Sequence, residues 1–291
     1  MNEGIIIKGV GGFYYVKAED KVIECRARGV FRKNKITPLV GDRVQIRISD
    51  EDNTGYIEKI FERKSELIRP PVANVNHALF VFAVKHPNPN LWLLDRFLLL
   101  AMKQNLDVTI CFNKIDLATE DEVRELSNIY IKAGYKVITS SKITRQGINK
   151  LKETLKDKIT VLAGPSGVGK STLLNNIQPN LQLKTGEISK KTKRGKHTTR
   201  YAELLELDFG GWVVDTPGFS SLDIDFVEIE DLDSYFKDIC RHSVNCKFNS
   251  CRHNKEPNCG VKEAVEKGEI SRSRYENYLM FLEELEKIRR Y

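Results

Sequence analysis

The chain has 291 residues, of which 41% are hydrophobic and 30% charged, the composition of a globular protein with room for two or three domains. Its net charge of +7 is compatible with a nucleic-acid or ribosomal partner, although a solubilising surface charge explains it as well. No signal peptide is evident. The most apolar stretch, residues 91–102, contains Asp95 and Arg96 and is too short for the ~20 apolar residues of a membrane span. We therefore expect a cytoplasmic protein with no membrane contact, and a buried amphipathic helix at residues 91–102.

Residues 1–69 have the pattern of an all-β domain. Short alternating or β-branched runs, separated by Gly, Asp and Asn, occur at residues 5–8, 13–16, 22–28, 43–48 and 56–61. About five strands in so short a segment favour a small closed barrel, with an OB-fold as the first interpretation and an SH3-like barrel as the alternative. Pro70-Pro71 is then interpreted as a linker.

Residues 70–221 alternate between strand and helix patterns. Apolar strand runs are expected at residues 78–84, 108–112, 136–139, 160–163 and 212–214. Helical patterns lie between them, at residues 90–104, 120–133 and 147–155. This alternation predicts an α/β domain with a doubly wound parallel sheet. Residues 222–291 are polar and predict a third, mostly α-helical domain.

A phosphate-binding loop follows the strand expected at residues 160–163. The eight residues after it match the pattern G-x-x-x-x-G-K-[ST], and Thr172 follows them: Gly164, Pro165, Ser166, Gly167, Val168, Gly169, Lys170 and Ser171. Glycines allow the backbone N–H groups to converge on phosphate oxygens, and a helix N-terminus adds its dipole. We expect Lys170 to reach the β- and γ-phosphates and the Ser171 hydroxyl to bind Mg²⁺.

A second motif selects the base. Asn113-Lys114-Ile115-Asp116 follows the strand expected at residues 108–112, where ligands bind in open α/β sheets. The Asp116 carboxylate can accept hydrogen bonds from guanine N1–H and N2–H₂, whereas adenine offers no such pair of donors. Asn113 can bridge loops, and the Lys114 stem can cover the purine. Together with the phosphate loop, this motif predicts GTP rather than ATP, the alternative being a P-loop ATPase.

The loop after the next strand, Thr139-Ser140-Ser141-Lys142, resembles the S-A-K loop of GTPases, with Ser141 where the alanine usually lies. The alternative is an ordinary loop between strand and helix.

Two switch elements are expected near the γ-phosphate. Asp215-Thr216-Pro217-Gly218 matches D-x-x-G, in which Asp215 would hold Mg²⁺ through water and the Gly218 N–H would meet the γ-phosphate. Thr198 or Thr199, in a basic segment, would close over Mg²⁺ in the GTP state. Phe219 stands where Ras-like GTPases carry a water-orienting glutamine, so we predict slow intrinsic hydrolysis. Another polar group, from this protein or from a partner, would then orient the water, and His197 is a candidate.

The C-terminal region contains a candidate metal centre. Cys246-x₄-Cys251-x-His253-x₅-Cys259 supplies three thiolates and one imidazole, the ligand set of a structural tetrahedral Zn²⁺ site. Cys240 and His242 are alternative ligands, while Cys25 and Cys111 are expected in the core. Residues 271–290 carry an apolar helical stripe that should pack against a neighbour. Their arginines, which could reach phosphates but are more simply read as a solvated face, are Arg272, Arg274, Arg289 and Arg290.

With these motifs in the order N-K-x-D, G-x-x-x-x-G-K-S, T-T, D-T-P-G and C-x₄-C-x-H-x₅-C, the chain resembles the bacterial ribosome small-subunit-dependent GTPase A family over essentially its whole length. The resemblance implies an OB-fold, a circularly permuted GTPase domain and a zinc domain. It also implies GTP hydrolysis stimulated by the small ribosomal subunit, a role in that subunit's late maturation, contacts with ribosomal RNA, and a monomer. The alternatives are a permuted GTPase acting on the large subunit and an RNA-binding module whose nucleotide site is only structural.

The permuted order places the D-x-x-G motif directly before the zinc domain. We therefore hypothesise that GTP binding repositions that domain through residues 219–225.

Overall fold

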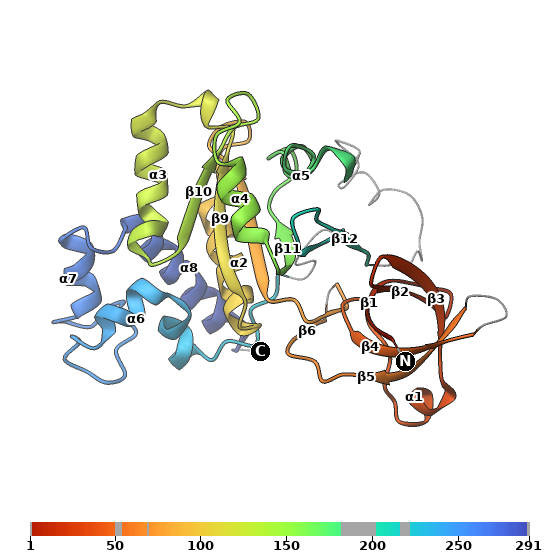
Figure 1. Cartoon of the computed structure of the whole chain (residues 1–291). Coiled ribbons are helices and arrows are strands. Elements are labelled where there is room, and N and C mark those ends of the chain that lie inside the picture. Colours follow the sequence, from red (N-terminus) through yellow and green to blue (C-terminus); the bar gives the residue numbers. More distant parts are fainter. Residues whose placement is uncertain (1, 50–53, 69, 182–201, 216–221, 290–291) are drawn as a thin grey trace.

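The computed structural model describes residues 2–49, 54–68, 70–181, 202–215 and 222–289. Its three regions follow one another in space as in the chain: a barrel at one end, an α/β sheet in the middle and a helical module at the other end (Figure 1). We refer to these as the barrel, the sheet domain and the helical module.

The barrel is closed by five strands in the order β1-β2-β3-β5-β4. Their bounds are β1 Asn2–Val10, β2 Phe13–Ala18, β3 Lys21–Ala27, β4 Arg43–Ile48 and β5 Gly55–Ile60. Alternate side chains point inward, as the period of two requires, so that Ile23 and Cys25 of β3 are buried beside Val44 and Ile57. Helix α1, Gly29–Lys33, lies between β3 and β4. The predicted OB-like barrel is confirmed.

The junction after the barrel is structured. Strands β6, Glu66–Leu67, and β7, Val72–Ala73, pair antiparallel on either side of the two prolines. Val72 also forms a bridge to Val40, and the Ala73 N–H donates to the Val40 carbonyl at 2.8 Å. The interpretation of Pro70-Pro71 as a linker is therefore wrong, because the segment that contains them is paired with itself and with the barrel.

The sheet domain has six strands in the order β10-β9-β8-β11-β13-β12. Their bounds are β8 His77–Ala83, β9 Asp107–Asn113, β10 Lys136–Ser140, β11 Ile159–Ala163, β12 Leu204–Glu206 and β13 Trp212–Val214. The first five in this order are parallel, as predicted. The sequence interpretation missed the three-residue β12, which pairs antiparallel with β13.

Helices cover both faces of the sheet, because its central strands are largely apolar and buried on both sides. All seven residues of β8 are buried: Phe80 and Phe82 face the cluster that includes α2 and α3, while Leu79 and Val81 face the cluster that includes α4 and α5. The helices are α2 Leu91–Lys103, α3 Glu120–Lys132, α4 Ile148–Leu155 and α5 Lys170–Ile177. The doubly wound arrangement is confirmed, and no helix among the described residues is long and apolar enough to cross a membrane.

The barrel contacts the outer edge of the sheet domain. Lys8 of β1 forms an antiparallel bridge with Glu203 and an ion pair with its carboxylate at 3.1 Å. Lys17 of β2 pairs with Glu206 of β12 at 2.9 Å. The strand that was missed in the sequence therefore connects the two regions.

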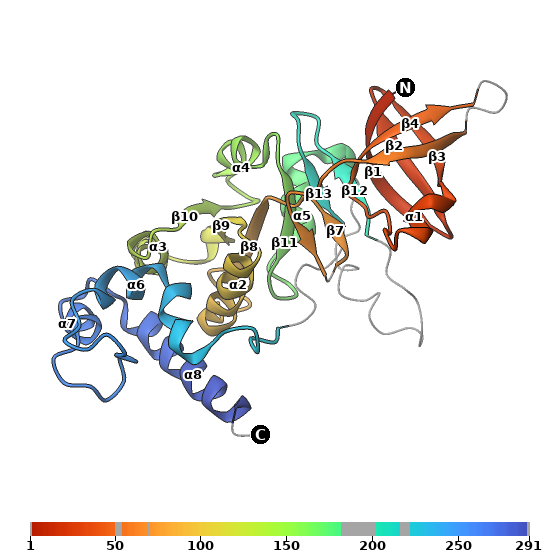
Figure 2. The ribbon, with the colours of Figure 1, turned by 90° about the horizontal axis from the view of Figure 1, so that it is seen from below.

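The helical module packs on α2 (Figure 2). It contains the 3₁₀ segment Ile229–Tyr235 and helices α6 Lys237–Ser243, α7 Gly260–Glu266 and α8 Arg272–Ile288. Trp92 of α2 stacks on Phe281 of α8 with ring centroids 5.4 Å apart, and Arg96 forms two 2.7 Å bonds to Glu284.

Arg274 of α8 is buried and ion-paired, unlike either prediction made for it. Arg274 is 1% exposed and binds Asp95 of α2 at 2.5 Å and Asp238 of α6 at 2.7 Å. Both sequence interpretations, a phosphate ligand and a solvated face, are wrong for this residue, because two buried carboxylates occupy its guanidinium. Arg272 is exposed as expected, Arg289 pairs with Glu228, and Arg290 lies outside the described residues.

Candidate functional site

The sheet brings the sequence motifs to one edge. Because β9, β10, β11 and β13 are parallel, the loops that follow their carboxyl ends lie on the same side of the domain. Asn113 ends β9, and Ser141, Gly164 and Asp215 directly follow β10, β11 and β13. Elements that are far apart in sequence, and permuted in order, therefore meet at one site.

The phosphate loop runs from β11 into α5. Gly164 has φ +151°, and a Cβ there would lie 2.0 Å from the Val81 carbonyl oxygen. Gly169 has φ +94°, and a Cβ there would lie 2.7 Å from Asn113 Nδ2. Both positions therefore require glycine, for conformation and for space. Lys170 begins α5, Ser171 and Thr172 follow it in the first turn, and Ser171 is buried.

Lys170 folds back over this loop. Its Nζ donates to the carbonyls of Gly164 at 2.7 Å and Pro165 at 2.8 Å. Burial lowers the pKa of Lys170 to about 8. A phosphate group brought near this amine would favour its charged form, so the loop offers a cation whose protonation is coupled to anion binding. Ser166 and Gly167 are exposed on the outer turn, and Val168 is buried beneath it.

The base-reading segment is tied to the phosphate loop. Asn113 is buried and donates through Nδ2 to the Val168 carbonyl at 2.9 Å. Lys114, in a left-handed conformation at φ +62°, donates to the carbonyls of Gly167 at 2.7 Å and of His86. Asn113 therefore bridges loops, as the sequence predicted, and Lys114, which was expected to cover the purine, bridges loops as well.

Ser141 fills the position assigned to alanine with a specific contact. Its hydroxyl donates to Asp116 Oδ1 at 2.5 Å and accepts the backbone N–H groups of Ile143 and Thr144. The Asp116 side chain is exposed, so its carboxylate keeps free lone pairs while Ser141 fixes its orientation. The departure from S-A-K thus adds a hydrogen bond to the residue that is expected to read guanine.

Ser140 also points into the base-reading segment. It is fully buried and its hydroxyl donates to Asn113 Oδ1 at 3.0 Å. The two serines therefore hold the two functional side chains of N-K-x-D, one each.

The switch elements are described only in part. Asp215 follows β13, and its N–H donates to the Glu203 carbonyl at 2.7 Å, which places this carboxylate at the same edge of the sheet. The other predicted residues lie outside the described part of the chain: His197, Thr198, Thr199, Gly218 and Phe219.

The predicted metal ligands meet in the helical module. Cys246 Sγ, Cys251 Sγ, His253 Nδ1 and Cys259 Sγ all lie within 4.8 Å of one another. The sulfurs of Cys246 and Cys259 are 3.8 Å apart, and each is 3.4 Å from His253 Nδ1. A tetrahedral Zn²⁺ with Zn–S bonds of about 2.3 Å spaces its ligand atoms by about 3.5–3.8 Å. The ligand set fits zinc in chemistry and in spacing.

The alternative ligands lie apart from this cluster. Cys240 is exposed, and His242 faces Glu269 at 3.6 Å. The sequence interpretation missed Asp233, whose carboxylate lies 3.6 Å from His253 Nε2, a buried atom with no hydrogen-bond partner among the described residues. A carboxylate in this position orients a metal-bound imidazole. No sequence signal marked Asp233, because it precedes the Cys/His cluster in a different element.

The apolar stripe of α8 also contacts the loop that carries the predicted metal ligands. The Tyr275 hydroxyl donates to the His253 carbonyl at 2.6 Å, and the Tyr278 hydroxyl to the Arg252 carbonyl at 3.1 Å. These bonds support a loop that has little apolar core.

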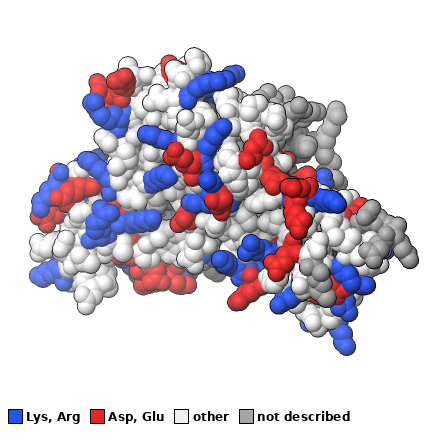
Figure 3. Space-filling model, in the orientation of Figure 1, with Lys and Arg blue, Asp and Glu red and all other residues white. Residues whose placement is uncertain are grey.

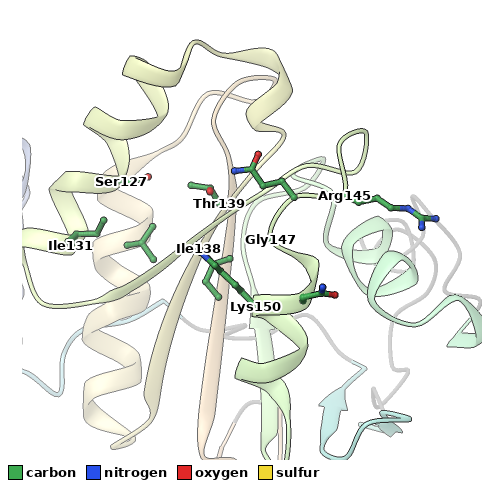
Figure 4. Close-up of a pocket in the computed structure, with 10 residues that line it drawn as sticks. Ser127, Ile131, Ile138, Thr139, Arg145, Gly147 and Lys150 are labelled. Atoms are coloured by element: carbon green, nitrogen blue, oxygen red, sulfur yellow. The ribbon is translucent and has the colours of Figure 1, made fainter.

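A pocket of about 430 Å³ lies beside the base-reading loop, over β10 and between α3 and α4 (Figure 4). Ser127, Ile131, Thr139, Arg145 and Lys150 are among its lining residues. It does not coincide with the phosphate loop, none of whose residues line it.

Comparisons with known proteins agree with this geometry. A family model described as RsgA GTPase matches residues 60–225, and one described as RsgA N-terminal domain matches residues 3–57. The small ribosomal subunit biogenesis GTPase RsgA of Alkaliphilus metalliredigens is 54% identical over 292 residues, covering 100% of both chains. That of Caldanaerobacter subterraneus is 50% identical, covering 97% of this chain and 95% of the relative.

Two solved structures are similar in fold and sequence. YjeQ from Thermotoga maritima has a TM-score of 0.84 and 44% identity, covering 98% of each chain. YloQ, described as a circularly permuted GTPase, has a TM-score of 0.81 and 43% identity, covering 99% of this chain and 96% of that one.

Proposed function

Since this chain belongs to the RsgA GTPase family, we propose that it binds GTP at the carboxyl edge of its sheet and assists the late maturation of the small ribosomal subunit. The observation that carries this proposal is the convergence of the phosphate loop and the N-K-x-D segment through the 2.9 Å bond from Asn113 to Val168. Similarity over the whole chain to relatives named for small-subunit biogenesis supports the ribosomal role.

The described residues of the site support the proposed nucleotide binding. Backbone N–H groups of residues 164–171 and the Lys170 amine would bind the phosphates. Asp116, oriented by Ser141, would accept the two guanine donors, and Ser140 would keep Asn113 in place. A bound base would cover the exposed Asp116 carboxylate and remove water from it. A base without matching donors would then leave the lone pairs that Ser141 does not use without hydrogen bonds.

Mg²⁺, when bound, would neutralise charge on the β- and γ-phosphates. Ser171 would bind it directly, Thr198 would add a ligand in the GTP state, and Asp215 would hold it through water. Gly218 would contact the γ-phosphate. We propose slow intrinsic hydrolysis, accelerated on the small subunit, because Phe219 cannot orient water by hydrogen bonding. His197 would supply the polar group that orients water, and Thr199 is the alternative to Thr198 as the residue that closes over Mg²⁺.

The zinc centre has a structural role in this proposal. Four protein ligands leave no open position for a substrate, which is the pattern of structural rather than catalytic zinc. One Zn²⁺ would stabilise the loop between α6 and α7 and keep the helical module folded against α2.

The partner is proposed to be the small subunit and its ribosomal RNA, met by a monomer in the cytoplasm. On the face shown in Figure 3, basic side chains are interspersed with acidic ones over the sheet domain and the helical module. The net charge of +7 therefore does not by itself mark an RNA-binding face there.

GTP turnover with purified small subunits tests this function. We expect stimulation by small subunits and none by large subunits. Lys170→Ala should abolish turnover and Asp116→Asn should weaken GTP binding, while Lys156→Ala, an exposed lysine at the end of α4, should behave as wild type. Stimulation by large subunits instead would favour the large subunit as the partner. GTP turnover that neither subunit changes would refute the ribosomal role.

A further inference from the structure

A buried chain of hydrogen bonds leads from the core to the phosphate loop. Cys111 Sγ lies 3.1 Å from Ser140 Oγ, which lies 3.0 Å from Asn113 Oδ1. Asn113 Nδ2 in turn lies 2.9 Å from the Val168 carbonyl. Cys111 and Ser140 are 0% exposed and Asn113 is 4% exposed, so water does not compete for these bonds.

The donor and acceptor of each hydrogen bond in this series are fixed by the Val168 carbonyl, at its phosphate-loop end. The Val168 carbonyl can only accept, so Asn113 must turn its amide N–H toward Val168 and its oxygen toward Ser140. The single hydroxyl proton of Ser140 must then point to Asn113. Ser140 has no second proton, and the contact with Cys111 is a hydrogen bond only if the thiol donates.

We propose that Cys111 is a positioning residue of the nucleotide site, whose S–H donates to Ser140 and thereby holds Asn113 against the phosphate loop. This inference rests on the proposed function, since it assigns a role in binding a guanine nucleotide.

One further observation supports the thiol as a donor. Burial raises the pKa of Cys111 to about 12, so the proton remains on sulfur at neutral pH. The Asn113 amide also lies next to Gly169, where a Cβ would come within 2.7 Å of Nδ2. A shift of this amide would therefore be felt at the turn that precedes Lys170.

Cys25 provides a control for the loss of a buried thiol. Cys25 is also 0% exposed, but it lies in the barrel core, and among the described residues the hydrogen-bond partner of its thiol is the Ile23 carbonyl at 3.6 Å. Loss of this thiol removes a buried sulfur without touching the nucleotide site.

The test uses the full-length zinc-loaded protein and GDP. Cys111→Ala and Cys111→Val, one smaller and one larger, both remove the donor, whereas Cys111→Ser keeps one. We expect the two donor-less variants to weaken GDP affinity by about fivefold, the effect of one buried hydrogen bond, and Cys111→Ser to stay within about twofold of wild type. Cys25→Ala should leave GDP affinity unchanged.

A merely structural role would give a different pattern. In that case the GDP affinities of the variants would be equal, or would follow their melting temperatures without nucleotide, and Cys111→Ser would bind no better than Cys111→Ala. Either result would overturn the proposal. Failure of the wild-type protein to bind GDP would instead refute the proposed function, so the two failures are distinguishable.

An infrared measurement tests the hydrogen bond itself, without relying on nucleotide affinity or on the variants Cys111→Ala and Cys111→Val. The S–H stretching band that disappears in Cys111→Ser is that of Cys111. Removing its acceptor with Ser140→Ala should shift this band to higher frequency, whereas a band that does not move shows that the thiol donates no bond to Ser140.

Discussion

Replacing Arg274 with methionine should loosen the helical module from the sheet domain. The guanidinium is 1% exposed and lies between two carboxylates, Asp95 of α2 and Asp238 of α6. Methionine keeps much of the side-chain volume but removes the charge and all three bonds to the acids. Asn277 still donates to Asp95 at 2.7 Å, while Asp238 loses both of its bonds to Arg274.

The expected loss is large because the remaining charges are buried. Removing one partner of a buried ion pair costs about 3–5 kcal/mol, since the other partner stays desolvated and unpaired. Here Asp95 and Asp238 are 0% and 2% exposed, so we expect a loss in that range. That is a substantial part of the roughly 5–15 kcal/mol that stabilises a typical protein.

The loss should also depend on pH. Burial raises the pKa of Asp95 even with Arg274 present, and removing the cation should raise it further. A carboxyl whose folded pKa lies above its unfolded value binds more protons when folded, so it penalises the folded state increasingly as pH rises. The deficit of Arg274→Met relative to wild type should therefore be smaller at about pH 5 than at about pH 7.5.

Urea unfolding followed by Trp92 fluorescence measures this loss, because Trp92 stacks on Phe281 at the interface. Trp212→Phe removes the second tryptophan from every variant. The control is Arg272→Met, an exposed arginine in the same helical turn, which should change stability by less than about 0.5 kcal/mol. Adding Asp95→Asn and Asp238→Asn to Arg274→Met should recover much of the loss. A deficit no larger than that of Arg272→Met would refute the reasoning.

Three further predictions concern the site and the metal. Ser141→Ala should weaken GDP binding by about tenfold, because Asp116 loses a hydrogen bond to a charged group; unchanged affinity in calorimetry would contradict this. GDP affinity should fall by about tenfold per pH unit above about pH 8, since burial lowers the pKa of Lys170 to about 8 and phosphate binding needs the protonated amine; Lys170→Arg should flatten the profile, and parallel profiles would argue against this coupling. Cys259→Ser should lose zinc by elemental analysis and expose Trp92 to quenchers, whereas full retention of zinc would rule out this ligand set.

The sequence was most informative where a function depends on contiguous residues. The phosphate loop was predictable because one short segment supplies the glycines, the lysine and the helix start. The strands of the sheet were predictable because buried parallel strands are mostly apolar, as residues 78–83 of β8 are. Strand β12 was missed because this edge strand, unlike the equally short β13, has no continuous apolar run, and because its place depends on β13 and on the barrel.

The role of Arg274 depends on partners that are remote in sequence. Asp95 lies 179 residues away and Asp238 lies 36 away, so no local pattern pairs them. A signal was nevertheless present. Arg274 shares the helical stripe of Tyr278 and Leu285, and Asp95 interrupts an apolar run. A charged residue in register with a buried stripe indicates a buried partner of opposite charge.

The contacts of the helical module bear on how nucleotide state could be transmitted. The permuted order suggested that GTP binding repositions this module, because D-x-x-G directly precedes it. The module is instead held to α2, which precedes the base-reading segment, by the Arg274 network and by Arg96, whose guanidinium binds both Glu284 and the Leu222 carbonyl. Breaking such a network costs about 3–5 kcal/mol, more than the roughly 1–3 kcal/mol of a typical allosteric coupling. Movement of the whole module away from α2 is therefore disfavoured. Leu222 lies four residues after the D-x-x-G motif, and Glu203 immediately precedes β12. One chain position near each switch is therefore bound to Arg96 or to Lys8 of the barrel. The barrel and the helical module thus each have a direct contact near one switch. A change at a switch would reach the contacting region without separating the helical module from α2.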